Sequence, residues 1–372
     1  MRQLAFCRVF AIEFCMAVFC NGCAEHSETM RSDIRPVARS MTSVKMREVR
    51  RVGEDLRFPS SVSFSPNSDR IIVAAELFLK SYDVASGKEL PENMDYGLYA
   101  PFAFSADGRH VAAKAAKIGF DGVAVFRYPE WTEKVIVPNT TSSPSQAIAF
   151  APDGKTIAIA EMRTNFFLQA YGRVIIVAVD DGRIVHSFDI SSGPVFSLAF
   201  SPDGRTLAVG TANGFQMHFG YHSGDVRLFN IEKRKMERRI SPNIRDALCL
   251  TYSPDGSQLA IGGGGGAVCV FHVADGRLVR LPVPESLRGA GVETLYFTQD
   301  GRHLLVGYRG ELTLWDAANG AQLDLRVPLR KAERLSSPAV FSADGHLMAA
   351  GVIRENKQYS IAVYSVDFER AK

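Results

Sequence analysis

The sequence predicts an all-β chain built from one repeated small sheet, and three observations support this prediction. A short apolar strand, a Ser-Pro-Asp-Gly-like turn and a second apolar strand recur, with the clearest copies at 198–210 and 250–262. Seven such turns follow one another at spacings of 40 to 52 residues, which suits a four-stranded unit covered by its neighbours. No amphipathic helix is recognisable after residue 45. We therefore expect a seven-bladed β-propeller of four-stranded antiparallel blades.

The turns have residue types that fit a tight reversal of the backbone. Pro presets φ at the second position, Asp tolerates the third, and Gly supplies the positive φ from which the next strand begins. The third and fourth positions of the seven turns are Asn67-Ser68, Asp107-Gly108, Asp153-Gly154, Asp203-Gly204, Asp255-Gly256, Asp300-Gly301 and Asp344-Gly345. A second hairpin signal, such as Asp181-Gly182, follows in several units.

The strands of each unit differ in polarity. The first two are nearly continuous apolar runs, as at 70–75 and 155–160, which is typical of strands covered on both faces. The fourth strands are more polar. The segment 231–240 carries charges of both signs and indicates a solvated outer edge, protected by charge against aggregation.

The two ends of the repeat array predict how the ring closes. The seventh unit supplies three strands, at 338–342, 346–352 and 360–366, and the printed sequence then stops without a fourth. One strand candidate, 45–52, lies upstream of the first unit. We expect it to complete the last blade, so that an N-terminal strand closes the ring by hydrogen bonds and leaves only short edges.

The units resemble the WD-repeat (WD40-like) family of β-propellers. The Ser-Pro-Asp-Gly turn and the strand ending Leu314-Trp315-Asp316 carry the resemblance, which covers residues 45–372. Only this unit has the Trp-Asp pair, and no unit has the family's Gly-His pair, so the family's His–Asp network is not transferred. The equivalent pairs are Tyr82-Asp83, Phe126-Arg127, Val177-Ala178, Phe229-Asn230, Phe271-His272 and Tyr364-Ser365. Except for Val177, the first residue is aromatic and is expected to pack between blades.

Composition limits the classes of partner. The chain has 372 residues, 46% of them hydrophobic, and the repeats favour one large domain over residues 45–372. The net charge is +3, and no long basic stripe with interleaved aromatics is present. Nothing therefore indicates a nucleic-acid partner.

The N-terminus resembles an export signal. Residues 1–23 combine a basic start, the apolar run 9–19 and small residues near the end, which is typical of a signal peptide. The sequence Cys20-Asn21-Gly22-Cys23 resembles the cleavage box of bacterial lipoproteins, in which Cys23 would carry the lipid. Residues 24–44 are polar and aperiodic, and we expect a flexible tether. The expected location is the periplasm or cell envelope; a cytoplasmic chain is the alternative.

The motifs in the sequence favour a binding protein over an enzyme. The glycines at 262–266 lead from one strand into another, without the helix N-terminus that a phosphate site needs. His218 and His222 are the only close histidine pair, and a metal site would need one or two more ligands from elsewhere. We expect no enzyme activity, no cofactor and no metal. The alternative is an enzyme or ligand binder with its site at the mouth of the central channel.

Two long aromatic connections are the best candidates for a binding site. In consecutive units the connections 163–172 and 213–222, here called the aromatic loops, join the second strand to the third and should lie at the same end of the ring. Exposed aromatic clusters are enriched where partners bind. The candidate residues are Phe166, Phe167, Tyr171, Phe215, His218, Phe219 and Tyr221. The alternative is that the loops pack on each other or extend the strands. The expected function is a monomeric scaffold for a protein or peptide partner.

Overall fold

The computed structural model describes residues 44–56, 59–75, 78–91, 97–117, 120–138, 147–164, 170–190, 193–213, 223–308, 310–342 and 344–368. All of them belong to a unit that runs from Met41 to Lys372. The predicted signal peptide, the tether up to residue 43, and Cys23 lie outside the described residues. Within those residues the chain is all-β apart from one 3-10 turn, η1 (Glu285–Leu287), which confirms the all-β part of the prediction.

The described strands form five four-stranded sheets and one seven-stranded sheet, and neighbouring strands pair antiparallel. The first sheet consists of β2 (Pro59–Phe64), β3 (Arg70–Ala75), β4 (Phe78–Asp83) and β5 (Glu89–Leu90). The second consists of β6 (Gly97–Phe104), β7 (His110–Lys117), β8 (Phe120–Arg127) and β9 (Thr132–Pro138). The third consists of β10 (Ala147–Phe150), β11 (Thr156–Thr164), β12 (Ala170–Ala178) and β13 (Ile184–Ile190).

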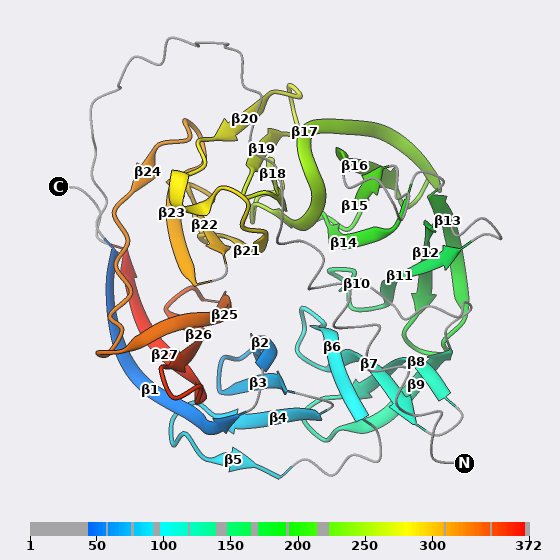
Figure 1. Cartoon of the computed structure of the whole chain (residues 1–372). Coiled ribbons are helices and arrows are strands. Elements are labelled where there is room, and N and C mark those ends of the chain that lie inside the picture. The colour runs from blue at the N-terminus through cyan, green and yellow to red at the C-terminus, as the bar shows by residue number, and fades with distance from the viewer. Residues whose placement is uncertain are drawn as a thin grey trace. The chain divides into compact units, whose positions relative to one another are not determined.

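The remaining sheets complete the ring that Figure 1 shows. The seven-stranded sheet consists of β14 (Val195–Phe200), β15 (Thr206–Asn213), β16 (Ser223–Asn230), β17 (Lys235–Tyr252), β18 (Gln258–Gly264), β19 (Val268–His272) and β20 (Leu278–Leu281). It is followed by β21 (Val292–Phe297), β22 (His303–Tyr308), β23 (Glu311–Asp316) and β24 (Gln322–Leu323). The last sheet consists of β25 (Glu333–Phe341), β26 (Leu347–Arg354), β27 (Tyr359–Phe368) and β1 (Val44–Leu56).

Five separate four-stranded sheets, not seven, appear among the described residues, because β17 joins two predicted units. Its first part pairs with β16 from Lys235 to Ile244, and its second part pairs with β18 from Arg245 to Tyr252. Asn243 and Asp246, with φ of 52° and 45°, redirect the backbone within this strand. Figure 1 shows β17 as one long curved ribbon. Ser241, Pro242 and Asn243 are therefore part of one continuous strand.

The closing strand is where the sequence predicted it. β1 pairs antiparallel with β27, from Val44 opposite Phe368 to Leu56 opposite Tyr359. This strand is longer than the predicted segment 45–52 and is the outermost strand of its sheet. The last blade therefore combines strands from the two ends of the described chain, as expected for a closed ring.

An ion-pair cluster attaches the closing strand to the far side of its own sheet. Arg51 donates to Glu333 on β25 at 2.6 Å and to Glu48 at 2.8 Å. Arg354 on β26 donates to the same Glu333 carboxylate at 3.2 Å. The side chains of Arg51 and Glu333 are only 4% and 1% exposed. Because both charges are withdrawn from water, removing either partner would leave the other poorly compensated.

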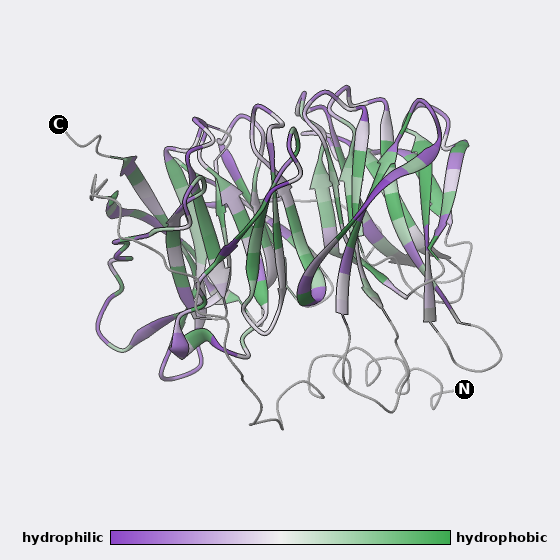
Figure 2. Cartoon of the chain, turned by 90° about the horizontal axis from the view of Figure 1, so that it is seen from above, coloured by the Kyte–Doolittle hydropathy of each residue, from purple (hydrophilic) through white to green (hydrophobic). Residues whose placement is uncertain are grey.

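The hydrophobic core lies between successive sheets. One cluster, for example, joins Val62 and Ile71 of the first sheet to Ile361 and Val363 of the last. Figure 2 shows hydrophobic residues along the strands and hydrophilic residues in many of the connecting turns. The position expected to pack between blades is buried in every unit. Its residues are Tyr82, Phe126, Val177, Phe229, Phe271, Trp315 and Tyr364. This confirms the predicted role of that position.

The repeated turns are stabilised by one hydrogen-bond arrangement. The Ser253 hydroxyl donates to the Asp255 carboxylate at 2.6 Å and accepts from the amide of Gln258 at 2.9 Å. Gly256 has a φ of 72°, which glycine adopts without strain. The corresponding Ser or Thr makes the same bond to Asp in four other units, beginning at Ser105, Ser201, Thr298 and Ser342.

Successive turns also touch one another. A Cβ placed on Gly108 would lie 3.2 Å from Pro66, and one on Gly256 would lie 3.3 Å from Pro202. The turns therefore pack in sequence at one end of the ring. The connections between second and third strands lie at the other end, because the strands of each sheet are antiparallel.

Candidate functional site

Most of the predicted partner-binding residues lie outside the described residues. These are Phe166, Phe167, Phe215, His218, Phe219 and Tyr221. Tyr171 is described: it is half-buried in β12, opposite Arg163 of β11. Residues 163–164 and 170–172 belong to strands, so that part of the predicted loop extends the sheet.

The bases of the two aromatic loops lie close together at one end of the ring. A Cβ on Gly172, at the start of β12, would lie 2.6 Å from Val195 of β14. Val195 in turn pairs with Thr211 of β15, two residues before that strand ends. Neighbouring units thus bring the two connections to the same end, as the sequence analysis expected. Whether their aromatic side chains form a binding surface stays a prediction.

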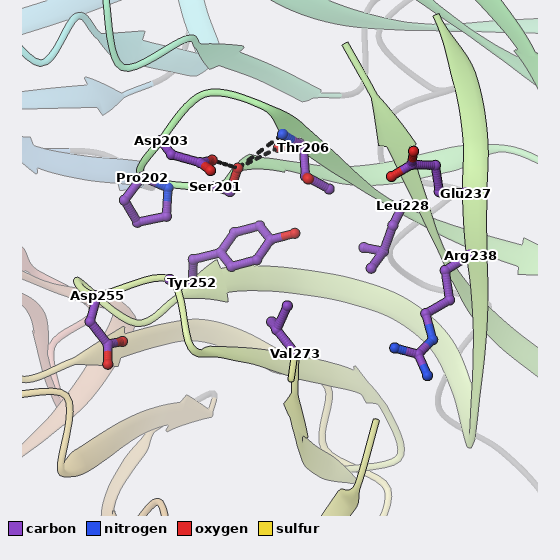
Figure 3. A pocket seen from close by; sticks show the side chains of 11 residues that line it. Ser201, Pro202, Asp203, Thr206, Leu228, Glu237, Arg238, Tyr252, Asp255 and Val273 are labelled. Atoms are coloured by element: carbon purple, nitrogen blue, oxygen red, sulfur yellow. Dashed lines mark hydrogen bonds between the residues drawn. The ribbon is translucent and has the colours of Figure 1, made fainter. Parts of the chain in front are cut away.

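The described residues also enclose a cavity at the opposite end, which we call the turn cavity. Its volume is about 540 Å³, and its lining comes from two neighbouring turns and two outer segments. Asp203 and Asp255 come from the turns, Tyr252 from the end of β17, and Glu237 and Arg238 from the charged part of the same strand. Figure 3 shows the ring of Tyr252 in the middle of these side chains, with Leu228 and Val273 beside it.

The two turn carboxylates of this cavity are anionic at neutral pH. The Ser201 hydroxyl, at 2.6 Å, and the Arg205 amide hold the pKa of Asp203 below its usual range. The Ser253 and Ser257 side chains lower the pKa of Asp255 in the same way. No ion pair within the described ranges includes either carboxylate. Neither carboxylate forms an ion pair there, although the charge of Arg205 also lowers the pKa of Asp203.

The opposite wall of the cavity contains groups that already have partners. Glu237 accepts a hydrogen bond from Lys233 at 2.9 Å, and this bond lowers the pKa of Glu237. The Arg238 guanidinium lies 5.0 Å from the centre of the Phe271 ring. Burial raises the pKa of the Tyr252 hydroxyl, and the charge of Asp203 acts in the same direction, so the phenol stays neutral.

In the described ranges no group of three or more His, Cys, Asp and Glu side chains is placed to hold a metal ion. Cys249 and Cys269 are free, and burial raises the pKa of both thiols, to about 12 for Cys249. Among the same residues no helix is long and apolar enough to cross a membrane.

The sequence does not indicate the turn cavity. Its pattern indicates turn residues at Asp203 and Asp255, and a solvated outer edge at Glu237 and Arg238. Each interpretation describes its own segment correctly. Only the packing of neighbouring units brings these segments around Tyr252, and no local signal in the sequence indicates that meeting.

Comparison with known protein families supplies independent information. Residues 173–215 match the family model described as WD domain, G-beta repeat. The match begins in β12 and ends just after β15, so it joins strands of two successive units. The match and the ring of sheets together support a WD-repeat β-propeller. No curated protein matches this chain. WD-repeat propellers generally mediate protein–protein interactions and are usually non-enzymatic.

Proposed function

We propose that this WD-repeat propeller is a non-enzymatic scaffold that binds a protein or peptide partner. The observation that carries the proposal is the WD-repeat match on a ring of closely packed antiparallel sheets. Such a ring holds its connections on a rigid framework, so recognition needs only the surface residues that those connections provide.

The aromatic loops are the proposed partner surface. At their bases Gly172 packs against Val195, so the two connections lie at the same end of the ring. Large aromatic side chains contribute strongly to binding when they are presented from a fixed position. The proposed contact residues are Phe166, Phe167, Tyr171, Phe215, His218, Phe219 and Tyr221.

Export and anchoring complete the proposal. The signal-like segment 1–23 would direct the chain to the periplasm or cell envelope, Cys23 would carry a lipid, and residues 24–44 would act as the tether. Membrane contact would come only through that lipid. Intact-mass analysis of the protein purified from its native host tests this. A chain that begins at Cys23 with added lipid mass supports anchoring; an unprocessed N-terminus contradicts export.

We further infer that the seven-stranded sheet acts as two blades, which gives seven blades in all. The inference rests on the change of pairing partner within β17, from β16 before Ile244 to β18 after it. Each half then has four strands, like the other sheets.

The partner surface is tested by replacing Phe166, Phe167, Phe215 and Phe219 together with Ser. We expect partner capture in a crosslinking pull-down to fall about tenfold or more, because aromatic anchors dominate such interfaces. The melting temperature should be unchanged. Loss of the fold would show that these aromatics belong to the core, and unchanged capture would place the partner elsewhere.

A further inference from the structure

Two exposed apolar side chains belong to the hairpin that borders the turn cavity. Five large hydrophobic residues are exposed in the described part of the chain, among them Val273 and Leu278, at 37% and 38%. Val273 lines the cavity itself. Leu278 lies on β20 opposite Phe271, the residue on which Arg238 of the cavity packs. The outer side of the cavity is thus partly apolar.

The outer part of β17 contacts the β19–β20 hairpin. The Arg238 side chain packs on Phe271 of β19, and a Cβ on Gly276 would collide with its guanidinium. The outer part of β17 and this hairpin therefore form one continuous rim. Val273 and Leu278 belong to that rim, and Leu228 and Tyr252 form the interior beneath it.

The charges divide the cavity into two sides. Figure 3 shows Asp203 and Asp255 on one side of the Tyr252 ring and Glu237 and Arg238 on the other. On the second side the charges are engaged, by Lys233 and by the Phe271 ring. On the first side both carboxylates accept hydrogen bonds only from their own turns in the described structure. The lining thus has three carboxylates, one of which pairs with Lys233, against the single guanidinium of Arg238, so negative charge is in excess.

We propose that the turn cavity binds a lysine or arginine side chain of a polypeptide segment. The cationic group would lie beside Asp203 and Asp255, and the methylene groups would pack on Tyr252 and Leu228. An aromatic face stabilises such cations, and their apolar stems suit a partly apolar cavity. Val273 and Leu278 would contact apolar residues that flank the basic one.

This site is separate from the proposed partner surface of the aromatic loops. The turns and the loops lie at opposite ends of the antiparallel strands. The scaffold would therefore have two recognition surfaces, one for aromatic contacts and one for a basic segment. Failure of one does not imply failure of the other.

The test uses purified protein and four mixtures of fluorescein-labelled nonapeptides. The central residue is fixed as Arg, Lys, Gln or Glu, and the flanking positions contain equal proportions of Ala, Leu and Ser. Fluorescence anisotropy measures binding. We expect the Arg and Lys mixtures to bind about tenfold more tightly than the Gln and Glu mixtures, as for a charge-assisted contact.

The decisive variant is Asp203→Asn with Asp255→Asn, which removes both charges and keeps an oxygen acceptor for each turn. It should bind all four mixtures equally. The matched control is Asp300→Asn, because Asp300 accepts the same bond from Thr298 at 2.6 Å and does not line the cavity. The control should keep the preference for basic residues.

Three outcomes would overturn the proposal: no basic preference in the natural sequence, a preference that survives the double substitution, or a preference lost equally in the control. A variant with Phe166, Phe167, Phe215 and Phe219 replaced by Ser should keep the basic preference. That result separates this site from the aromatic loops.

Discussion

At the scale of single residues, the repeated turns depend on a buried hydroxyl. Ser253 is 0% exposed, and its oxygen both donates to Asp255 and accepts from the Gln258 amide. The sequence identified Pro, Asp and Gly as turn residues but gave no role to this serine. Its role depends on the following strand, which places the Gln258 amide within hydrogen-bond distance of its hydroxyl.

Replacing Ser253 by Ala should destabilise the protein by about 1–3 kcal/mol, because it leaves a buried amide without its acceptor. Urea unfolding at neutral pH measures the change. Ser257→Ala is the control, since Ser257 donates to the same carboxylate but is exposed. Equal effects of the two substitutions would contradict the argument.

At the scale of elements, the closing strand combines backbone pairing with a buried ion pair. The strand itself was predictable, because the last unit lacked a fourth strand and one upstream strand candidate belonged to no unit. The ion pair was not predictable. Arg51 and Glu333 are 282 residues apart, and nothing local to either residue indicates the other.

Replacing Glu333 by Gln should cost about 3 kcal/mol at pH 7, because Arg51 then keeps only part of its compensation. Burial alone would raise the pKa of Glu333, but hydrogen bonds from Arg51 and Arg354 outweigh it, and the pKa lies below its usual value. A depressed carboxyl pKa gives stability that is complete above the unfolded value, about 4.3 for glutamate.

That stability is lost as the pH falls below this value and passes through the lower folded pKa. The difference in unfolding free energy between the natural protein and Glu333→Gln should therefore shrink over about one to two pH units below pH 5. Urea unfolding at several pH values measures it. A difference that is constant with pH would show that Glu333 contributes packing rather than charge.

At the scale of the whole molecule, the sequence predicted the ring but not how two of its units join. The spacing of the turns and the recurring aromatic residue near the end of the third strand, such as Trp315, predicted the repeat, and both depend on local chemistry. The repeats predicted two separate units here. The structure instead keeps β17 continuous and packs its crossing against three glycines, Gly210, Gly224 and Gly263.

Gly224→Ala should destabilise the seven-stranded sheet by about 1–3 kcal/mol, the usual cost of overpacking. The new Cβ would lie 2.6 Å from the Ala247 nitrogen and 2.7 Å from the Asp246 carbonyl carbon, and neither is a mobile side chain. Gly291→Ala is the control, because its Cβ would meet only the end of Leu248 at 3.5 Å. The urea midpoint of each variant gives the comparison, and a neutral Gly224→Ala would mean that the crossing can move.

The pairing of Val44 with Phe368 brings the first and last described residues side by side. The order of the units along the chain is therefore not essential to the ring. If a short linker joined these two ends, the chain could be opened at another connection and every sheet would keep its strands. Such a circular permutant would move the N-terminus, and with it any attached anchor, to a different blade while leaving both recognition surfaces in place.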